Sequence, residues 1–393
     1  QFDLLRGSFM VIPTALSARD LRRALSDLKQ LDRVDARTMP SSFYTSDDFN
    51  KLEQDHIFRR EWVCLGHIGE IPNSGDFFTT ELVGEQLLVT RGNDDQIRVL
   101  SNVCRHRGNL VEAHQKGNRR SFVCPYHAWT YGIDGRLKTA PLMKKVKSFD
   151  MKGCRLPNLS TEVWNNFVFV NLDGTAQPLA PQLENLQSIL HNYHHEDRNL
   201  LFCEDTEWAT NWKNLTENFM EGYHLFATHP KTLQPMTPTQ LCKKVPGEGR
   251  WTAYRSYYDP DYPPRGPFHP DMTEDEKKNT VLFNVFPSFV IAVAANYTLY
   301  LCLRPNGPDK VSIRWGVCGL KTDPNDPEVV AYVQLCKDFN GEDKEKLETL
   351  QIAQNTRFYQ SGPLAPDDLE GTIWDFLGYM ERMLGVERDL DEI

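Results

Sequence analysis

Two histidines and a carboxylate lie within the nine residues 221–229 of this chain. Glu221 and His224 are three residues apart, so on a helix they would fall on neighbouring lines of one face. His229 lies five residues past His224 and precedes Pro230, so we expect the helix to loosen or end between the two histidines. A bend there would turn both imidazoles toward one point. Two imidazoles and a carboxylate with open positions suit non-haem Fe(II), whereas ordinary half-buried histidines near a helix end are the alternative.

A second motif combines cysteine and histidine in two short loops. Cys104 and His106 are separated by one residue, and Cys124 and His127 follow with two residues between them. A zinc finger usually groups its cysteines and its histidines separately. One thiolate and one imidazole per loop instead suit a Rieske [2Fe–2S] cluster, in which both cysteines bind one iron and both histidines bind the other. A zinc site is the alternative.

A third candidate ligand is Asp343, which we expect to begin a helix over about 342–358. Leu347, Leu350 and Gln354 follow at helical spacing and continue the line of the aspartate along an inward face. An aspartate in that place is either a metal ligand or a cap at the helix N-terminus. Spacing alone leaves both interpretations open.

The composition narrows the class of protein. The chain has 393 residues and a formal net charge of −10, which argues against nucleic acid and anionic membrane as partners. Nine cysteines are scattered along the chain without a dense disulfide framework, so we expect most to be reduced and the protein to be cytoplasmic. No signal peptide is visible, and the most apolar run, residues 286–303, is shorter than the ~20 apolar residues of a spanning helix. We expect a soluble enzyme.

The patterns predict an α+β protein with three parts. Helical patterns over about 17–28 and from 46 onward place N-terminal helices in residues 1–58. Short strands at 86–90, 97–100, 120–124 and 167–170 predict an all-β domain over 59–174. Residues 175–393 mix strands with helices at about 183–191, 325–337, 342–358 and 366–384. Within them, Val311, Ile313, Trp315 and Val317 alternate with less apolar residues, which predicts a half-buried strand.

With these motifs in hand, the chain resembles the catalytic α subunit of a Rieske non-haem iron oxygenase of the ring-hydroxylating type. The resemblance runs from about Phe43 to the C-terminus and rests on the two Cys/His loops, residues 211–229, and more weakly residues 340–343 and 362–364. It implies a Rieske [2Fe–2S] domain beside a catalytic domain in which a curved antiparallel sheet wraps around a long helix, with N-terminal helices packed on the catalytic domain. It favours Asp343 over Asp338 as the third ligand of a mononuclear Fe(II).

The resemblance also implies a role for Glu221 between subunits. In related enzymes an acidic residue at this position links the mononuclear iron site to a Rieske histidine of the neighbouring subunit. Here the bridge would connect His224 with His127 of another chain. Most members carry aspartate at this position, and the glutamate is similar to the branch that acts on carnitine and related quaternary ammonium compounds.

The implied reaction consumes O2 and electrons. A separate reductase would take the electrons from NAD(P)H, because no Gly-rich nucleotide-binding fingerprint follows any predicted strand. The electrons would pass through the Rieske cluster to the iron of an adjacent protomer, which suggests a homotrimer by resemblance.

Three functions follow, in order of preference. Aromatic residues in the catalytic half could form a cation–π cage for a methylated ammonium group, although most are expected to be core residues; they are Trp208, Trp212, Trp251, Tyr254, Tyr257, Tyr258, Phe283, Phe286, Phe289, Tyr297 and Tyr300. Hydroxylation of an N-methyl group of a betaine such as stachydrine or glycine betaine would then release formaldehyde. The second function is hydroxylation of an aromatic ring, and the third is electron transfer by a Rieske protein without oxygenase activity.

Overall fold

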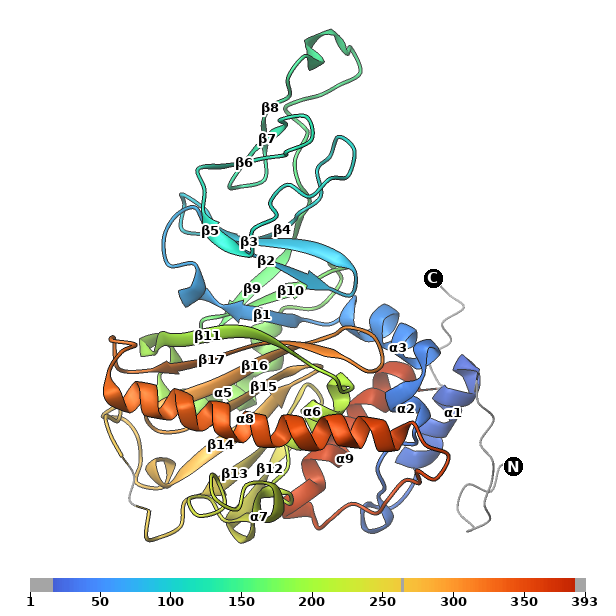
Figure 1. Ribbon diagram of the computed structural model, residues 1–393, viewed down its shortest axis with the longest axis vertical. Helices are drawn as coiled ribbons and strands as arrows, with labels where there is room; N and C mark the ends of the chain where they lie inside the picture. Colours follow the sequence, from blue (N-terminus) through green and yellow to red (C-terminus); the bar gives the residue numbers. More distant parts are fainter. Residues whose placement is uncertain (1–16, 263–264, 386–393) are drawn as a thin grey trace.

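The chain folds into two stacked units, with the upper unit above the lower one in Figure 1. The computed structural model describes residues 17–262 and 265–385. The upper unit is built from β1 to β10, and the lower unit holds β11 to β17 and the long helices. The predicted α+β class, with an all-β unit ahead of a curved antiparallel sheet and a long helix, is confirmed.

The upper unit contains a seven-stranded sheet in the order β1-β10-β9-β4-β3-β2-β5 and a three-stranded sheet, β6-β7-β8. Asn165 and Asn166 both adopt positive φ in the two-residue turn between β9 and β10, as tight hairpins require. Asn166 donates a hydrogen bond to the carbonyl oxygen of His195 (3.0 Å), so this turn is tied to the lower unit. The strands are β1 Val63–His67, β2 Asp76–Leu82, β3 Glu85–Arg91, β4 Ile97–Ser101, β5 Lys116–Asn118, β6 Ser121–Val123, β7 Thr130–Gly132, β8 Leu137–Thr139, β9 Asn158–Trp164 and β10 Phe167–Asn171.

The lower unit is organised around an antiparallel sheet in the order β11-β17-β16-β15-β14-β13-β12. Except for the β17-to-β11 pairing, neighbouring strands are consecutive in sequence, so most of the sheet forms as a meander. Its strands are β11 Asn199–Trp208, β12 Cys242–Glu248, β13 Trp251–Tyr257, β14 Asn279–Val285, β15 Phe289–Val293, β16 Tyr297–Pro305 and β17 Val311–Gly319.

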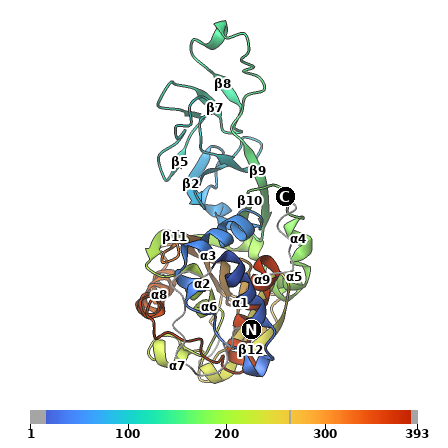
Figure 2. The same ribbon diagram turned by 90° about the vertical axis from the view of Figure 1, so that its right-hand side faces the viewer.

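Helices surround the lower sheet, and Figure 2 shows α8 and α5 on opposite sides of it. The predicted capping box at the first helix is present, because Ser17 and Asp20 exchange hydrogen bonds at the start of α1. No helix within 17–262 and 265–385 is long and apolar enough to cross a membrane. The helices are α1 Ala18–Lys29, α2 Ser42–Thr45, α3 Asp47–Glu53, α4 Leu179–Gln182, α5 Glu184–Leu190, α6 Trp212–Phe219, α7 Leu225–Thr228, α8 Pro327–Gln354 and α9 Asp367–Leu384.

The lower sheet is buried on both faces, with a separate core against each. On one face, Leu299, Leu301 and Leu303 of β16 pack in a core shared with α1, α3, α8 and α9. On the other, Tyr300 and Cys302 of the same strand pack with α4, α5 and β10. Successive residues of a strand point to opposite faces, so one strand supplies both cores.

This arrangement corrects the prediction for β17. The strand was predicted to be half-buried, yet Arg314 and Gly316 between its apolar residues are buried as well. Arg314 pairs with Asp205 (2.8 Å) and lies over the ring of Phe78 in the upper unit. The alternation of residue types is real, but the upper unit covers the face that the sequence pattern would leave to solvent.

A buried histidine at the junction of the two units predicts acid sensitivity. His67 of β1 is 3% exposed and packs against Phe167 and Tyr300, and burial lowers its pKa to about 4. The unfolded chain binds this proton below about pH 6.5, whereas the folded chain does so only below about pH 4. The free energy of unfolding is therefore expected to decrease as the pH is lowered from about 6.5 to about 4. This residue contributes up to about 1.4 kcal/mol of that loss per pH unit.

The measurement is the melting temperature of the protein at pH 7.5 and at pH 5.5. His67→Asn keeps an acceptor for the Gly69 amide but does not titrate, so its melting temperature should change less between the two pH values. The matched control is His191→Asn, which changes an exposed histidine and should retain the wild-type pH dependence. Equal pH dependence in wild type and His67→Asn would contradict the assignment.

Candidate active site

The segment from α6 to α7 carries the first candidate residues and is broken differently from the prediction. Helix α6 already ends at Phe219, residues 220–224 form no helix, and the single-turn helix α7 separates His224 from His229. Gly222 lies in this break, where a Cβ atom would lie 2.3 Å from Sγ of Cys242 on β12. Only glycine lets the backbone pass this strand so closely.

Three side chains from two distant segments converge behind this turn. Asp343 Oδ1 lies 3.0 Å from Nε2 of His229 and 3.6 Å from Nε2 of His224. The centroids of the two imidazole rings are 5.1 Å apart and the ring planes are inclined by 71°. Both Nε2 atoms face the carboxylate. All three ligand atoms lie within 4.8 Å of one another. The three predicted metal ligands are thus brought together.

The polar atoms of this group fit a metal ion. Nε2 of His229 and Oδ1 of Asp343 are both buried, and neither has a hydrogen-bond partner. Buried polar atoms are normally satisfied, and a cation bound between these two would satisfy both. Two imidazoles and one carboxylate are the donor set of non-haem Fe(II) sites with open positions.

The helix that supplies Asp343 differs from the prediction in a second way. Helix α8 runs without interruption from Pro327 to Gln354, so Asp343 lies in its middle and cannot be an N-terminal cap. Gly341 lies on an exposed face of this helix, where a glycine costs only about 1 kcal/mol. The substitute ligand, Asp338, is exposed and accepts a hydrogen bond from Gln334 (2.7 Å), away from the two histidines.

Glu221 holds the turn and one of its histidines. Its Oε2 accepts hydrogen bonds from the backbone amides of Tyr223 and His224, and its Oε1 lies 2.5 Å from Nδ1 of His224. Burial alone lowers the pKa of His224, but Glu221, assisted by Asp343, raises it to about 9. The site is therefore strongly favourable to positive charge. Glu221 orients the ring so that Nε2 faces Asp343.

Glu342 plays the matching part for His229 and was missed in the sequence. Its Oε2 lies 2.7 Å from Nδ1 of His229 and accepts a hydrogen bond from the Thr232 hydroxyl (2.6 Å). A carboxylate behind a ligating histidine fixes the ring and its tautomer. In the sequence, the only feature that could have pointed to Glu342 is its position next to Asp343.

We expect Glu342→Ala to weaken iron binding by about 10- to 100-fold, the usual effect of losing such a partner. Glu342→Gln keeps an acceptor oxygen and should lose less. The measurement is iron titration of the iron-free protein, with Glu345→Ala as control because Glu345 is exposed and pairs only with Lys346 among the described ion pairs. Unchanged affinity in Glu342→Ala would exclude the positioning role.

The two Cys/His loops of the upper unit form a second site. Both close in the same way, because Gly108 donates a backbone hydrogen bond to Cys104 and Ala128 donates one to Cys124, each at 3.0 Å. Gly108 and Ala128 both have positive φ, so each loop turns back in the left-handed conformation. The two loops therefore have the same backbone turn after their cysteine, and each carries one cysteine and one histidine.

The cysteines of this site are more deeply buried than its histidines. Cys104 and Cys124 are 3% and 1% exposed, whereas His127 is exposed. Nδ1 of His106 lies 3.1 Å from Nδ1 of His127, and the His106 ring stacks on Trp129. Sulfur donors inside and imidazoles at the surface fit an iron–sulfur cluster with one iron near solvent.

The chain matches two protein families. Residues 61–150 match the Rieske [2Fe-2S] domain, and residues 184–385 match the ring hydroxylating alpha subunit (catalytic domain), which is just over half of the chain. The chain belongs to the ring-hydroxylating α-subunit family. The Rieske match includes both Cys/His loops, which decides for the [2Fe–2S] cluster and against zinc, and the α-subunit match includes His224, His229 and Asp343.

Curated relatives of this α subunit include the carnitine monooxygenase oxygenase subunit of Escherichia coli strain K12, 33% identical over 50% of this chain and 53% of the relative. The glycine betaine monooxygenase oxygenase subunit of Pseudomonas aeruginosa strain UCBPP-PA14 is 32% identical over 55% of this chain and 50% of the relative. The chain thus spans about half the length of the curated relatives it matches. The fold is similar to the crystal structure of the quaternary ammonium Rieske monooxygenase CntA with an inhibitor, at 24% identity and a TM-score of 0.81, covering 91% and 98% of the two chains. The predicted domain boundaries after residues 58 and 174 stay predictions.

Proposed function

We propose that this α subunit is the oxygenase component of an enzyme that hydroxylates an N-methyl group of a betaine-type quaternary ammonium compound. The observation that carries the proposal is the site of His224, His229 and Asp343 in a chain whose relatives are named for carnitine and glycine betaine. One oxygen atom of O2 enters the C–H bond, and the other leaves as water with two electrons and two protons. The N–CH2OH group then loses formaldehyde and a proton to leave a tertiary amine.

In this proposal His224, His229 and Asp343 hold the mononuclear iron, which supplies the chemistry that activates O2 when bound. Glu221 and Glu342 keep the two rings in place. Burial of His229 and Asp343, 0% and 8% exposed, keeps bulk water from the reacting groups.

One aromatic side chain of α8 lies beside the proposed iron site and suits a methylated ammonium group. Phe339 lies 6.2 Å from the His229 ring, whereas Tyr332, which stacks on Tyr297 at 4.4 Å, lies about 16 Å along the helix from Asp343. Most of the aromatic residues singled out in the sequence, Tyr297 among them, pack in the two cores of the lower sheet, so Phe339 is the ring that we place against the ammonium group. Aromatic faces attract a cation within about 6 Å.

The substrate class is tested by measuring O2 uptake and formaldehyde with proline betaine, glycine betaine, carnitine and naphthalene. The proposal expects formaldehyde in proportion to O2 with at least one betaine and none with naphthalene. Aromatic turnover without formaldehyde would replace the proposal with ring hydroxylation. Release of trimethylamine without formaldehyde would show that the enzyme oxidises the other substituent of the nitrogen and not an N-methyl group.

We further propose that electrons reach the iron from the cluster of a second chain in a homotrimer. Figures 1 and 2 place β6 to β8 at one end of the chain and α7 at the other, so the two centres of one chain are poorly placed to exchange electrons. Tyr223 and Phe226 are 47% and 50% exposed beside Glu221, where a second chain's cluster loops could dock. Glu221 would then bridge His224 to His127 of that chain, and Glu221→Gln should lower turnover while both iron centres remain occupied.

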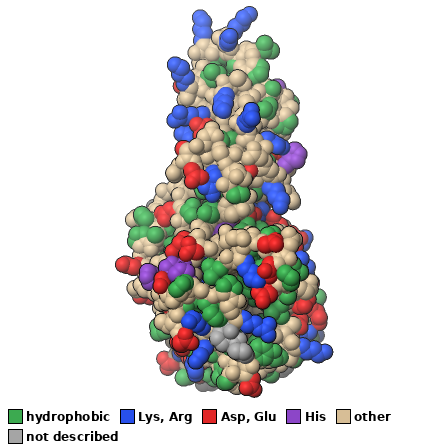
Figure 3. Space-filling model, turned by 90° about the vertical axis from the view of Figure 1, so that its left-hand side faces the viewer, with side chains coloured by type: hydrophobic (Ala, Val, Ile, Leu, Met, Phe, Trp, Pro, Cys, Tyr) green, Lys and Arg blue, Asp and Glu red, His purple; other side chains and the backbone are tan. Residues whose placement is uncertain are grey.

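This chain carries a positively charged surface that a separate reductase could bind. Residues 105–155 contain twelve Lys and Arg against three Asp and Glu, a net +9 in a chain of net −10. Figure 3 shows Lys and Arg side chains gathered over this end of the molecule. An acidic electron donor fits this surface, because complementary charge accelerates encounter.

Reversing three of these charges should weaken the encounter. For the triple variant Lys144→Glu, Lys145→Glu and Lys147→Glu we expect the KM for the reductase to rise about tenfold at low salt and the difference to shrink as salt screens the charges. The control reverses three exposed lysines of the rest of the chain, Lys51, Lys310 and Lys346. Steady-state turnover against reductase concentration measures both, and equal effects of the two triple variants would contradict a specific docking surface.

A further inference from the structure

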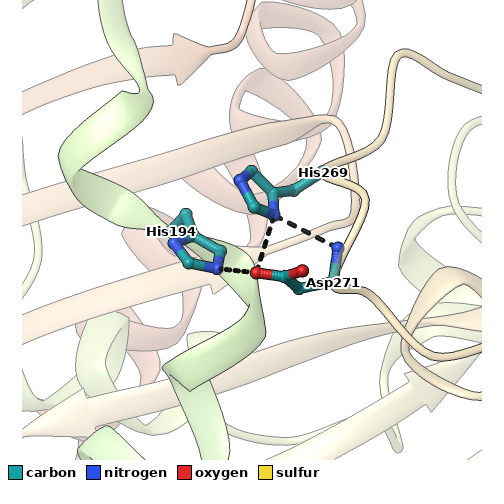
Figure 4. Close-up of side chains that lie close together, drawn as sticks. All are labelled: His194, His269 and Asp271. Atoms are coloured by element: carbon teal, nitrogen blue, oxygen red, sulfur yellow. Dashed lines mark hydrogen bonds and ion pairs between the residues drawn. The ribbon is translucent and has the colours of Figure 1, made fainter.

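A third group of metal-ligating side chains lies on the lower unit, outside both iron sites. His194 sits between two short 3-10 helices, and His269 and Asp271 come from the loop that follows β13. Figure 4 shows both imidazoles directed at the Asp271 carboxylate. The proposed oxygenase function does not use these residues.

The spacing of the donor atoms suits a small divalent cation. Oδ2 of Asp271 lies 2.9 Å from Nε2 of His194 and 3.7 Å from Nδ1 of His269, and all three ligand atoms lie within 4.8 Å of one another. Bond lengths of about 2.0–2.1 Å in a tetrahedral zinc site place neighbouring donors about 3.3 Å apart. The observed distances bracket this value, so small side-chain movements complete the geometry.

Each imidazole also has a carboxylate behind it, which is an independent observation. The remaining nitrogen of His194, Nδ1, lies 3.1 Å from Oε1 of Glu196, and that of His269, Nε2, lies 3.6 Å from Oδ2 of Asp197. Metal-bound histidines almost always donate their other N–H to a carboxylate or carbonyl. Each ring thus directs one nitrogen at Asp271 and the other at a second carboxylate, and a metal ion would take the place of the hydrogen bond from Nε2 of His194 to Asp271.

The two imidazole rings also pack directly against each other. The two imidazoles stack with centroids 3.7 Å apart and an angle of 26°, and two cationic rings would repel one another at this distance. The backbone amide of Asp271 donates a weak hydrogen bond to Nδ1 of His269 (3.3 Å). A metal ion would replace this contact with a stronger one.

The backbone holds His194 in place for this contact. Its φ of 44° and ψ of 67° are left-handed, a conformation that few non-glycine residues adopt. The two rings are largely covered, with side chains 19% and 20% exposed, whereas the Asp271 side chain is 61% exposed. An ion could therefore enter from solvent and keep water in its fourth position.

We propose that His194, His269 and Asp271 bind a divalent transition metal ion of the zinc class. Two imidazoles and a carboxylate with an open fourth position are a zinc donor set. The ion would join the 194 segment to the 269–271 loop, which are about 75 residues apart in sequence. It would act as a structural clamp, because a ligand that binds only the folded chain stabilises it.

The test is a zinc titration of tag-free protein with the cluster and the mononuclear iron already loaded, followed by calorimetry and melting temperature. Wild type should bind one additional zinc ion per chain and melt at a higher temperature with zinc. His269→Ala and Asp271→Asn should each weaken this binding at least about tenfold and remove the thermal shift, while iron content and turnover stay at wild-type values.

The control is His191→Ala, whose ring lies 6.0 Å from that of His194 and which is outside the proposed ligand set. It should bind zinc like wild type. A variant that fails to fold is recognised by its lower melting temperature without zinc, in which case the second ligand variant decides. No additional zinc in wild type, or equal loss in His191→Ala and His269→Ala, would overturn the proposal and leave His194 as a hydrogen-bonded bridge between carboxylates.

Discussion

Replacing Asp343 with alanine is expected to abolish oxygenase turnover and remove one of three irons per chain while the Rieske cluster remains. Asp343 is the only carboxylate among the described residues that faces both His224 and His229 in the metal-ligating group. Without it, two neutral imidazoles would have to hold Fe(II) alone. The loss of iron affinity should exceed the roughly 10- to 100-fold effect of losing an outer partner such as Glu342.

Iron content, the visible spectrum of the cluster and O2 uptake measure this result together. Asp338→Ala is the matched control, because Asp338 lies on the same helix but is exposed and away from the site. It should keep three irons and full turnover. An Asp343→Ala protein that keeps its third iron and its turnover would show that another group completes the site.

The second large effect is expected at a buried ion pair that joins α3 to α6. Nζ of Lys213 lies 2.6 Å from Oε1 of Glu53, and both side chains are 0% exposed. The Lys213 ammonium also lies 5.2–5.6 Å from the rings of Tyr44, Phe49 and Trp212. Burial lowers the pKa of Lys213 and raises that of Glu53, so each charge depends on the other.

Lys213→Met leaves the Glu53 carboxylate buried without its cation and should destabilise the protein by about 3–5 kcal/mol. Lys213→Met with Glu53→Gln removes both charges and should recover most of that loss, because Trp212 can still donate a hydrogen bond to the amide. Urea unfolding midpoints of the two single variants and the double variant measure the coupling. Additive losses would contradict a dependent pair.

The two Cys/His loops could be recognised in the sequence because their signal is local. Cys104 with His106 and Cys124 with His127 each occupy one short loop, and the loop closes through its own backbone. His224 and His229, the two proposed iron ligands, are also close to each other in the sequence. Asp343, however, lies 114 residues beyond His229, and no local pattern connects them. Its assignment depended on family resemblance, and its helix was predicted to start at about residue 342, whereas α8 begins at Pro327.

Features that depend on distant packing were missed. Glu342 appeared to be one more polar helix residue, since nothing in the sequence places His229 beside it. The strand β17 has the alternation of a half-buried strand, but the upper unit covers its polar face through Arg314. The sequence likewise separates His194 from His269 by 75 residues, so their meeting could be seen only after the chain had folded.

The separation of the cluster loops and α7 at opposite ends of the chain has a genetic consequence under the proposed transfer between chains. An allele that loses Cys104 still encodes a sound iron site, and one that loses Asp343 still encodes a sound cluster. Each allele alone gives an inactive enzyme. In a mixed assembly, a chain with an intact cluster lies next to a chain with an intact iron site, so one pair of centres is complete. Two defective alleles of this single gene would therefore complement one another as mutations in different genes do.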